Sequence, residues 1–164
     1  MKFFIPFGDW SDDGHGKYVT VLVEAPSKDH LLEAQKKIKA KYGERFFSKF
    51  ANDYEEPYLA EENWQALIDT NYPVERFKER QDDIRYENCK NIAEVVELGP
   101  ELGPYEDSCS DSIFVTLAVV KDAFIWLLNA FGAEIQVCEE HEQIPMICIW
   151  TCYGFEDVGY GCFD

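Results

Sequence analysis

The sequence predicts an α+β fold. We expect a single domain with a mostly antiparallel sheet of about five strands and helices packed mainly on one face. Three observations lead to this prediction. Apolar and polar residues alternate over residues 17–25, as in a half-buried strand. Apolar residues recur at helical spacing over residues 28–42. Residues 112–153 hold the densest apolar content of the chain, in a pattern typical of strand, helix, strand and strand.

The N-terminal part, residues 1–43, is predicted to form a β-hairpin followed by a helix. Residues 2–7 and 17–25 form the two strands of the hairpin. Ser27 is a suitable N-cap for a helix over residues 28–42, and Gly43 is a suitable stop. Leu31 and Ile38 then lie on the same apolar helix face.

Residues 44–98 are predicted to be a helical insert between two strand–helix units. Residues 60–70 form one helix, with Trp64 and Leu67 directed inward. From residue 74 to 98 the apolar stripe is thin, and residues 75–87 are mostly charged. This segment is therefore either a solvent-facing helix or a helix that breaks near Asp82 and Asp83.

Residues 112–153 are predicted to form a β-α-β-β unit. Residues 113–120 favour a strand, because their valines and Thr116 lose side-chain freedom in a helix. Asp122 caps a buried helix over residues 123–131, which ends at Gly132. Two further strands, 133–138 and 146–153, are joined by a polar turn at 139–143. The tail, 154–164, either adds an edge strand or stays partly loose.

The charge of the chain restricts its partners. Its 164 residues include 15 basic and 32 acidic residues, for a net charge of −17. Such a surface repels nucleic acid and anionic membranes, and it attracts basic surfaces. No apolar run is long enough to cross a membrane, and the N-terminus lacks a signal-peptide pattern. We therefore expect a cytoplasmic protein. A role in solubility alone also explains the charge.

The favoured function is a non-enzymatic protein-binding module that engages a basic partner surface, comparable in size and charge to small immunity or inhibitor proteins. Exposed aromatic residues rimmed by acids suit this role. The residues predicted to bind the partner are Trp10, Asp82, Asp83, Glu87, Phe155 and Tyr160.

A divalent-cation site is the first alternative, and it uses the loop between the first two strands. Asp9, Ser11, Asp13 and Gly14 match the first half of a calcium loop, and His15 follows as a further ligand. These residues resemble the EF-hand loop, but the twelfth position holds Thr20 instead of a bidentate Glu. A hairpin turn rich in Asp, Ser and Gly explains the same residues. Beyond this cation, the sequence predicts no cofactor.

A small hydrolase or transferase with His15 in a cleft is the second alternative. The chain has three histidines, and it lacks the motifs of phosphate-binding loops, dinucleotide sites and nucleophile elbows. The sequence therefore assigns no catalytic residue. Its six cysteines contain no C-x-x-C pair, and we expect them to be mostly buried, reduced thiols.

Overall fold

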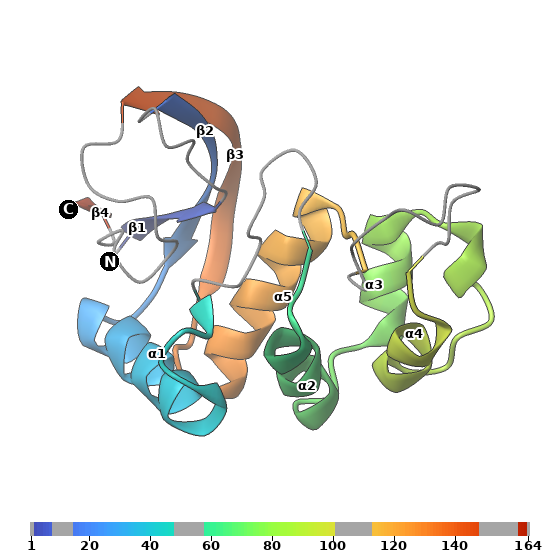
Figure 1. The fold of residues 1–164 in the computed structure, drawn as a ribbon. Helices are drawn as coiled ribbons and strands as arrows, with labels where there is room; N and C mark the ends of the chain where they lie inside the picture. The colour runs from blue at the N-terminus through green and yellow to red at the C-terminus, as the bar shows by residue number, and fades with distance from the viewer. Residues whose placement is uncertain (1, 8–14, 48–57, 101–112, 148–160, 164) are drawn as a thin grey trace.

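The computed structural model describes residues 2–7, 15–47, 58–100, 113–147 and 161–163. For residues 2–7, 15–22, 139–147 and 161–163 it describes the backbone only. The elements form a row rather than layers around one sheet (Figure 1). The sheet and α1 lie at one end, α5 follows, and α2, α3 and α4 lie beyond α5.

The sheet has four strands in the order β3-β2-β1-β4, and each neighbouring pair is antiparallel. Strands β1 (Lys2–Phe7) and β2 (His15–Glu24) pair along their length, so the predicted N-terminal hairpin is confirmed. Strand β4 (Gly161–Phe163) pairs with β1. The edge-strand alternative for the tail is therefore correct for these three residues.

Strand β3 (Gln136–Ile147) corrects the predicted C-terminal hairpin. Residues 139–143, expected to be a polar turn, lie inside this strand and pair with β2, for example Glu139 with Leu22. Two irregularities in the register place extra β3 residues opposite β2. A strand at the edge of a sheet exposes one side to water, and bulges and charged residues are common there. The polar run is therefore compatible with a strand, which the local pattern does not reveal.

Helix α1 (Lys28–Tyr42) has the predicted bounds. The Ser27 side chain caps it by accepting a hydrogen bond of 3.4 Å from the backbone N–H of His30. The predicted apolar face is buried, and the helix ends at Gly43, whose φ of 113° suits glycine. Local capping and periodicity therefore determine this element.

Helix α5 (Leu117–Ala130) begins where a strand was predicted. Thr116 is its N-cap, and the Thr116 hydroxyl accepts a hydrogen bond of 3.2 Å from the N–H of Val119. Asp122, predicted to cap the helix, lies inside it. Helix propensity is a weak preference that burial overrides, and both Val119 and Val120 are fully buried in the core. Gly132 has the positive φ expected after the helix.

The predicted helical insert forms three helices and a short 3-10 turn. These are α2 (Glu61–Asp69), α3 (Val74–Gln81), η2 (Ile84–Tyr86) and α4 (Ile92–Leu98). The chain leaves the α3 helix at Asp82, which adopts a left-handed conformation. Of the two alternatives for residues 74–98, the break near Asp82 and Asp83 is therefore the one that the structure contains.

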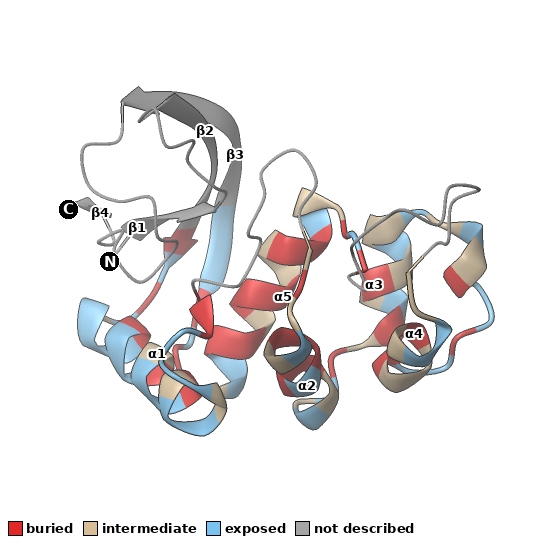
Figure 2. Ribbon diagram, in the orientation of Figure 1, coloured by how far each residue is buried: buried red, intermediate tan, exposed pale blue. Residues whose placement is uncertain are grey.

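Helix α5 runs through the core (Figure 2). Its buried face includes Phe124, whose ring packs edge-on against Phe47 at 5.4 Å. On one side α5 contacts α1, and on the other it contacts α2 and α3. Apolar burial on both sides stabilises the row of elements, because each helix removes its apolar stripe from water against a neighbour.

The predicted architecture is wrong. We expected about five strands with helices mainly on one face, but helical residues outnumber strand residues in the part of the chain that the structure describes. Residues 117–120 belong to a helix instead of a strand, and the predicted turn at 139–143 lies inside a strand. Residues 148–153 of the last predicted strand lie outside the described residues. Helices α2, α3 and α4 pack beyond α5 and do not cover the sheet (Figure 1).

Two cysteine side chains can be compared with the expectation of buried thiols. Cys89 is free and buried, as expected, whereas Cys138 is free and exposed. The other four cysteine side chains lie outside the described residues.

Candidate functional site

The predicted cation loop lies almost entirely outside the described residues. This applies to Asp9, Ser11 and Asp13, while His15 is the first residue of β2 and pairs with Ile147 in the register. Among the residues that the structure describes, no three His, Cys, Asp or Glu side chains gather in a way that could hold a metal ion. The cation site therefore stays a prediction.

The residues predicted to bind a partner divide into two groups. Trp10, Phe155 and Tyr160 lie outside the described residues. Asp82, Asp83 and Glu87 all lie in the segment between α3 and α4, which we call the acidic turn (residues 82–87). The break in the helix thus brings three predicted residues onto one short, irregular segment.

The acidic turn has a fixed geometry. The Asp83 side chain caps η2 by accepting a hydrogen bond of 2.9 Å from the backbone N–H of Arg85. The Arg85 guanidinium donates two hydrogen bonds to Oδ2 of the same carboxylate, one of 3.0 Å from Nε and one of 2.8 Å from Nη2. The guanidinium also lies over the Tyr86 ring, 5.0 Å from its centroid. Cap, ion pair and cation–π contact together order the turn.

Tyr86 anchors the turn in the core. Its side chain is fully buried, and its ring packs edge-on against Phe77 of α3 at 5.1 Å. By contrast, Ile84, two positions earlier, is 77% exposed. Single exposed aliphatic side chains are common on protein surfaces. Ile84 differs in that its turn is anchored in the core by Tyr86.

The carboxylates of the acidic turn differ in their surroundings. The neighbouring Arg85 holds the pKa of Asp83 below its usual range, so Asp83 is ionised near neutral pH and paired within the turn. Asp82 and Glu87 are exposed, and neither forms an ion pair with any residue that the structure describes. These two carboxylates therefore remain available to a cationic group on a partner.

A second cluster, which the sequence analysis missed, holds α3 against α5. Asp122 of α5 accepts hydrogen bonds from Arg76 at 3.0 Å (Nε) and 2.5 Å (Nη2), and from the Tyr72 hydroxyl at 2.5 Å. The guanidinium of Arg80 is 3.3 Å from the same carboxylate. Asp122 is only 11% exposed, so these partners compensate for removing its charge from water.

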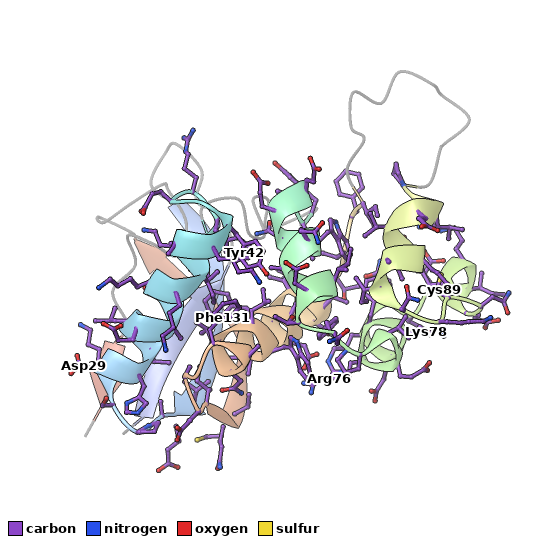
Figure 3. The ribbon with its side chains drawn as sticks, turned by 90° about the horizontal axis from the view of Figure 1, so that it is seen from below. Asp29, Tyr42, Arg76, Lys78, Cys89 and Phe131 are labelled. Atoms are coloured by element: carbon purple, nitrogen blue, oxygen red, sulfur yellow. The ribbon has the colours of Figure 1, made fainter. Side chains whose placement is uncertain are left out.

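Trp126 completes this cluster one turn along α5. The Arg76 guanidinium lies over the Trp126 ring, 5.5 Å from its centroid, where α3 meets α5 (Figure 3). The Trp126 Nε1–H donates a hydrogen bond of 3.1 Å to the Thr70 hydroxyl. The sequence feature that could have predicted this cluster is Asp122, because an acidic residue on a mostly apolar helix requires a partner.

The C-terminal end of α3 is attached to the start of α5. Gln81 Nε2 donates to the backbone oxygen of Phe114 at 3.2 Å, and Gln81 Oε1 accepts from the N–H of Thr116 at 3.1 Å. The Thr116 hydroxyl donates to the backbone oxygen of Arg80 at 2.8 Å. The acidic turn leaves α3 directly after Gln81, so the turn starts from a fixed point.

Catalytic chemistry finds little support in these contacts. Ser27 and His30 share a hydrogen bond of 2.9 Å, but both are at the N-terminus of α1, where Ser27 serves as the cap. His30 has no acidic partner among the described residues. Burial, together with the Asp122 hydrogen bond, raises the pKa of Tyr72 above its usual value, so its hydroxyl stays protonated at neutral pH. The His15 side chain lies outside the described residues, so the enzyme alternative is untested.

Comparison with known proteins gives no relative. No protein-family model, curated protein or solved structure matches the chain. Within the described residues, no helix has the length and apolar character needed to cross a membrane.

Proposed function

We propose that the protein is a non-enzymatic protein-binding module of the immunity or inhibitor kind, which engages a basic partner through the acidic turn. The observation that carries this proposal is the 77% exposure of Ile84 on a turn whose inner side is fixed. Asp82 and Glu87, both exposed, flank this aliphatic side chain along the chain. The turn therefore combines an apolar contact with free carboxylates.

An anchored turn favours binding because it is already ordered. Ordering a flexible segment on binding costs conformational entropy, whereas a preorganised segment avoids most of that cost. Tyr86 in the core and the Asp83–Arg85 pair supply this order. An apolar side chain that enters a pocket, surrounded by polar contacts, is a common arrangement at the centre of protein interfaces.

The charge of the molecule supports a basic partner. A net charge of −17 attracts a positively charged surface over several ångströms and increases the rate of encounter. The same charge opposes binding to nucleic acid, whose phosphates carry the same sign. Asp82 and Glu87 would then form the short-range charge contacts around Ile84.

Affinity capture with matched variants tests this proposal. The wild-type protein, Ile84→Arg and Leu32→Arg are immobilised and exposed to an extract of the cells from which the gene comes, and the retained proteins are quantified by mass spectrometry. Leu32, on α1, is also a large apolar residue with an exposed side chain, so it serves as a matched control. Each substitution adds one positive charge. We expect a basic protein that is retained by the wild type and Leu32→Arg, and lost with Ile84→Arg.

Salt provides the second part of the test. The same capture is repeated at about 50 mM and about 300 mM NaCl, because exposed charges are screened over shorter distances at the higher concentration. Retention should fall at high salt. Retention of the same proteins by both arginine variants, or binding that salt does not alter, would contradict the proposal.

A further inference from the structure

We propose that the cavity between the α2–α3 connection and the start of α4 binds a small organic anion with an apolar body. The cavity has a volume of about 380 Å³, within the range of small-molecule sites. This site is separate from the acidic turn and does not depend on the proposed partner.

The inner wall of the cavity is apolar. It includes Leu67 of α2, Tyr72 and Val74 around the start of α3, and Ile92 of α4, all of which are buried. The Tyr72 hydroxyl is occupied by Asp122, so Tyr72 offers its ring rather than a polar group. An aromatic or branched aliphatic group would remove this wall from water.

Three of the remaining lining residues, Asn71, Lys90 and Asn91, are exposed and carry side-chain hydrogen-bond donors. Lys90 is the only charged lining residue, and neither its ammonium nor the Asn71 side chain is bonded to a described residue. The Asn91 side-chain oxygen accepts from the N–H of Glu94 at 3.0 Å, which leaves the Asn91 amide group as a donor. An ammonium and amide N–H groups match a carboxylate.

Glu94 is an acidic residue in contact with the Lys90 backbone, and the structure accounts for its position. Its carboxylate accepts a hydrogen bond of 2.7 Å from the backbone N–H of Lys90, and Glu94 is not among the lining residues. The Glu94 carboxylate is therefore bound to the Lys90 backbone N–H and forms no ion pair with the Lys90 ammonium. In a chain of net charge −17, a cavity whose only lining charge is positive is selective for an anion.

A matched pair of probes tests the sign of the charge. Phenylacetate and 2-phenylethylamine share an apolar ring and carry opposite charges. Each is titrated into the isotope-labelled protein, and the backbone amide signals are followed by NMR. We expect phenylacetate to shift the amides of Asn71, Lys90 and Ile92 saturably, with a dissociation constant on the order of millimolar. The amine should bind at least roughly tenfold more weakly, because it loses the attraction to the Lys90 ammonium and is also repelled by it.

Three variants locate the site. Lys90→Gln should weaken phenylacetate binding about threefold, as expected for one exposed charge pair. Lys36→Gln makes the same change on the exposed surface of α1, and binding should be unaffected. Ala93→Leu adds volume at the cavity lining on α4 and should abolish binding while the rest of the spectrum stays unchanged.

Several results would overturn the proposal. These are the absence of shifts at these amides with phenylacetate up to about 20 mM, equal or tighter binding of the amine, and equal effects of Lys90→Gln and Lys36→Gln. None of these measurements involves Ile84 or a protein partner, so their outcome is independent of the proposed function.

Discussion

Asp122 shows how a single side chain links distant parts of this chain. Its carboxylate accepts hydrogen bonds from Tyr72 and Arg76, which are 50 and 46 residues away in sequence. In the middle of α5, an unpaired carboxylate would be costly because the site is largely shielded from water. The hydrogen bond with Asp122 also raises the pKa of Arg76.

Removing this carboxylate should destabilise the fold. In Asp122→Ala, two guanidinium groups and the Tyr72 hydroxyl lose their shared acceptor. We expect the free energy of unfolding to fall by about 2–3 kcal/mol. A fully buried pair would lose more, but the Arg76 side chain is 41% exposed and can regain water. Urea denaturation followed by circular dichroism measures the change.

Asp69 offers a matched control. It accepts a hydrogen bond of 2.8 Å from Tyr42 and lies 3.7 Å from the Lys41 ammonium, but its side chain is 31% exposed. Asp69→Ala therefore removes a similar set of contacts from a more hydrated position and should cost clearly less. Equal losses in the two variants would show that burial does not determine the contribution of Asp122.

The acidic turn behaves as a small element with its own electrostatics. Asp83 caps η2 and pairs with Arg85, and Tyr86 anchors the segment beneath. Because Asp83 satisfies the turn internally, Ile84, Asp82 and Glu87 are the groups that the turn presents outward. The proposed interface thus depends on Asp83, although Asp83 itself does not need to contact the partner.

The pH dependence of this element follows from the lowered pKa of Asp83. A carboxylate with a lowered pKa in the folded state adds stability above its unfolded value of about 3.9. That contribution is lost as pH falls through the lower folded value. Carboxyl-detected NMR should therefore give Asp83 a titration midpoint below about 3.9.

Substituting the neighbouring cation tests the cause. Arg85→Gln should move the Asp83 midpoint upward, because Arg85 is the main reason for the lowered pKa. A midpoint that does not change in Arg85→Gln would show that the ion pair is not responsible. The substitution leaves Ile84 and the exposed carboxylates in place, so the same variant can be used in the capture experiment.

At the scale of the whole molecule, the excess of acidic residues opposes the compact state. Repulsion among like charges lowers stability at low ionic strength, and salt screens it. Raising NaCl from about 20 mM to about 200 mM should add about 1 kcal/mol and raise the melting temperature by about 2–4 °C. A melting temperature that stays constant or falls would contradict this account of the charge.

The same melting experiment separates screening from the predicted cation loop. Calcium chloride replaces NaCl at equal ionic strength, and the double variant Asp9→Ala, Asp13→Ala serves as the control. If the loop binds calcium, the wild type gains stability beyond the NaCl value and the double variant does not. Equal curves for both proteins would leave these residues as a turn.

The sequence by itself determined the parts of the fold that depend on local interactions. The Ser27 cap and the periodic apolar face predicted α1 with the correct bounds, and alternation predicted the strands of the hairpin. The thin apolar stripe gave a break near Asp82 as one of two alternatives, and the structure contains that break. Caps and periodicity act within a few residues, so they can be recognised without a partner segment.

Only the tertiary structure decided the features that depend on distant residues. Residues 139–143 form a strand because β2 supplies their hydrogen-bonding partners, although their composition is typical of a turn. Thr116 begins a helix because it contacts Arg80 and Gln81 and because the following valines are buried. The Asp122 cluster, the exposure of Ile84 and the cavity beside Lys90 arise in the same way. Each of these features depends on how segments that are distant in sequence pack together, and neither segment alone predicts that packing.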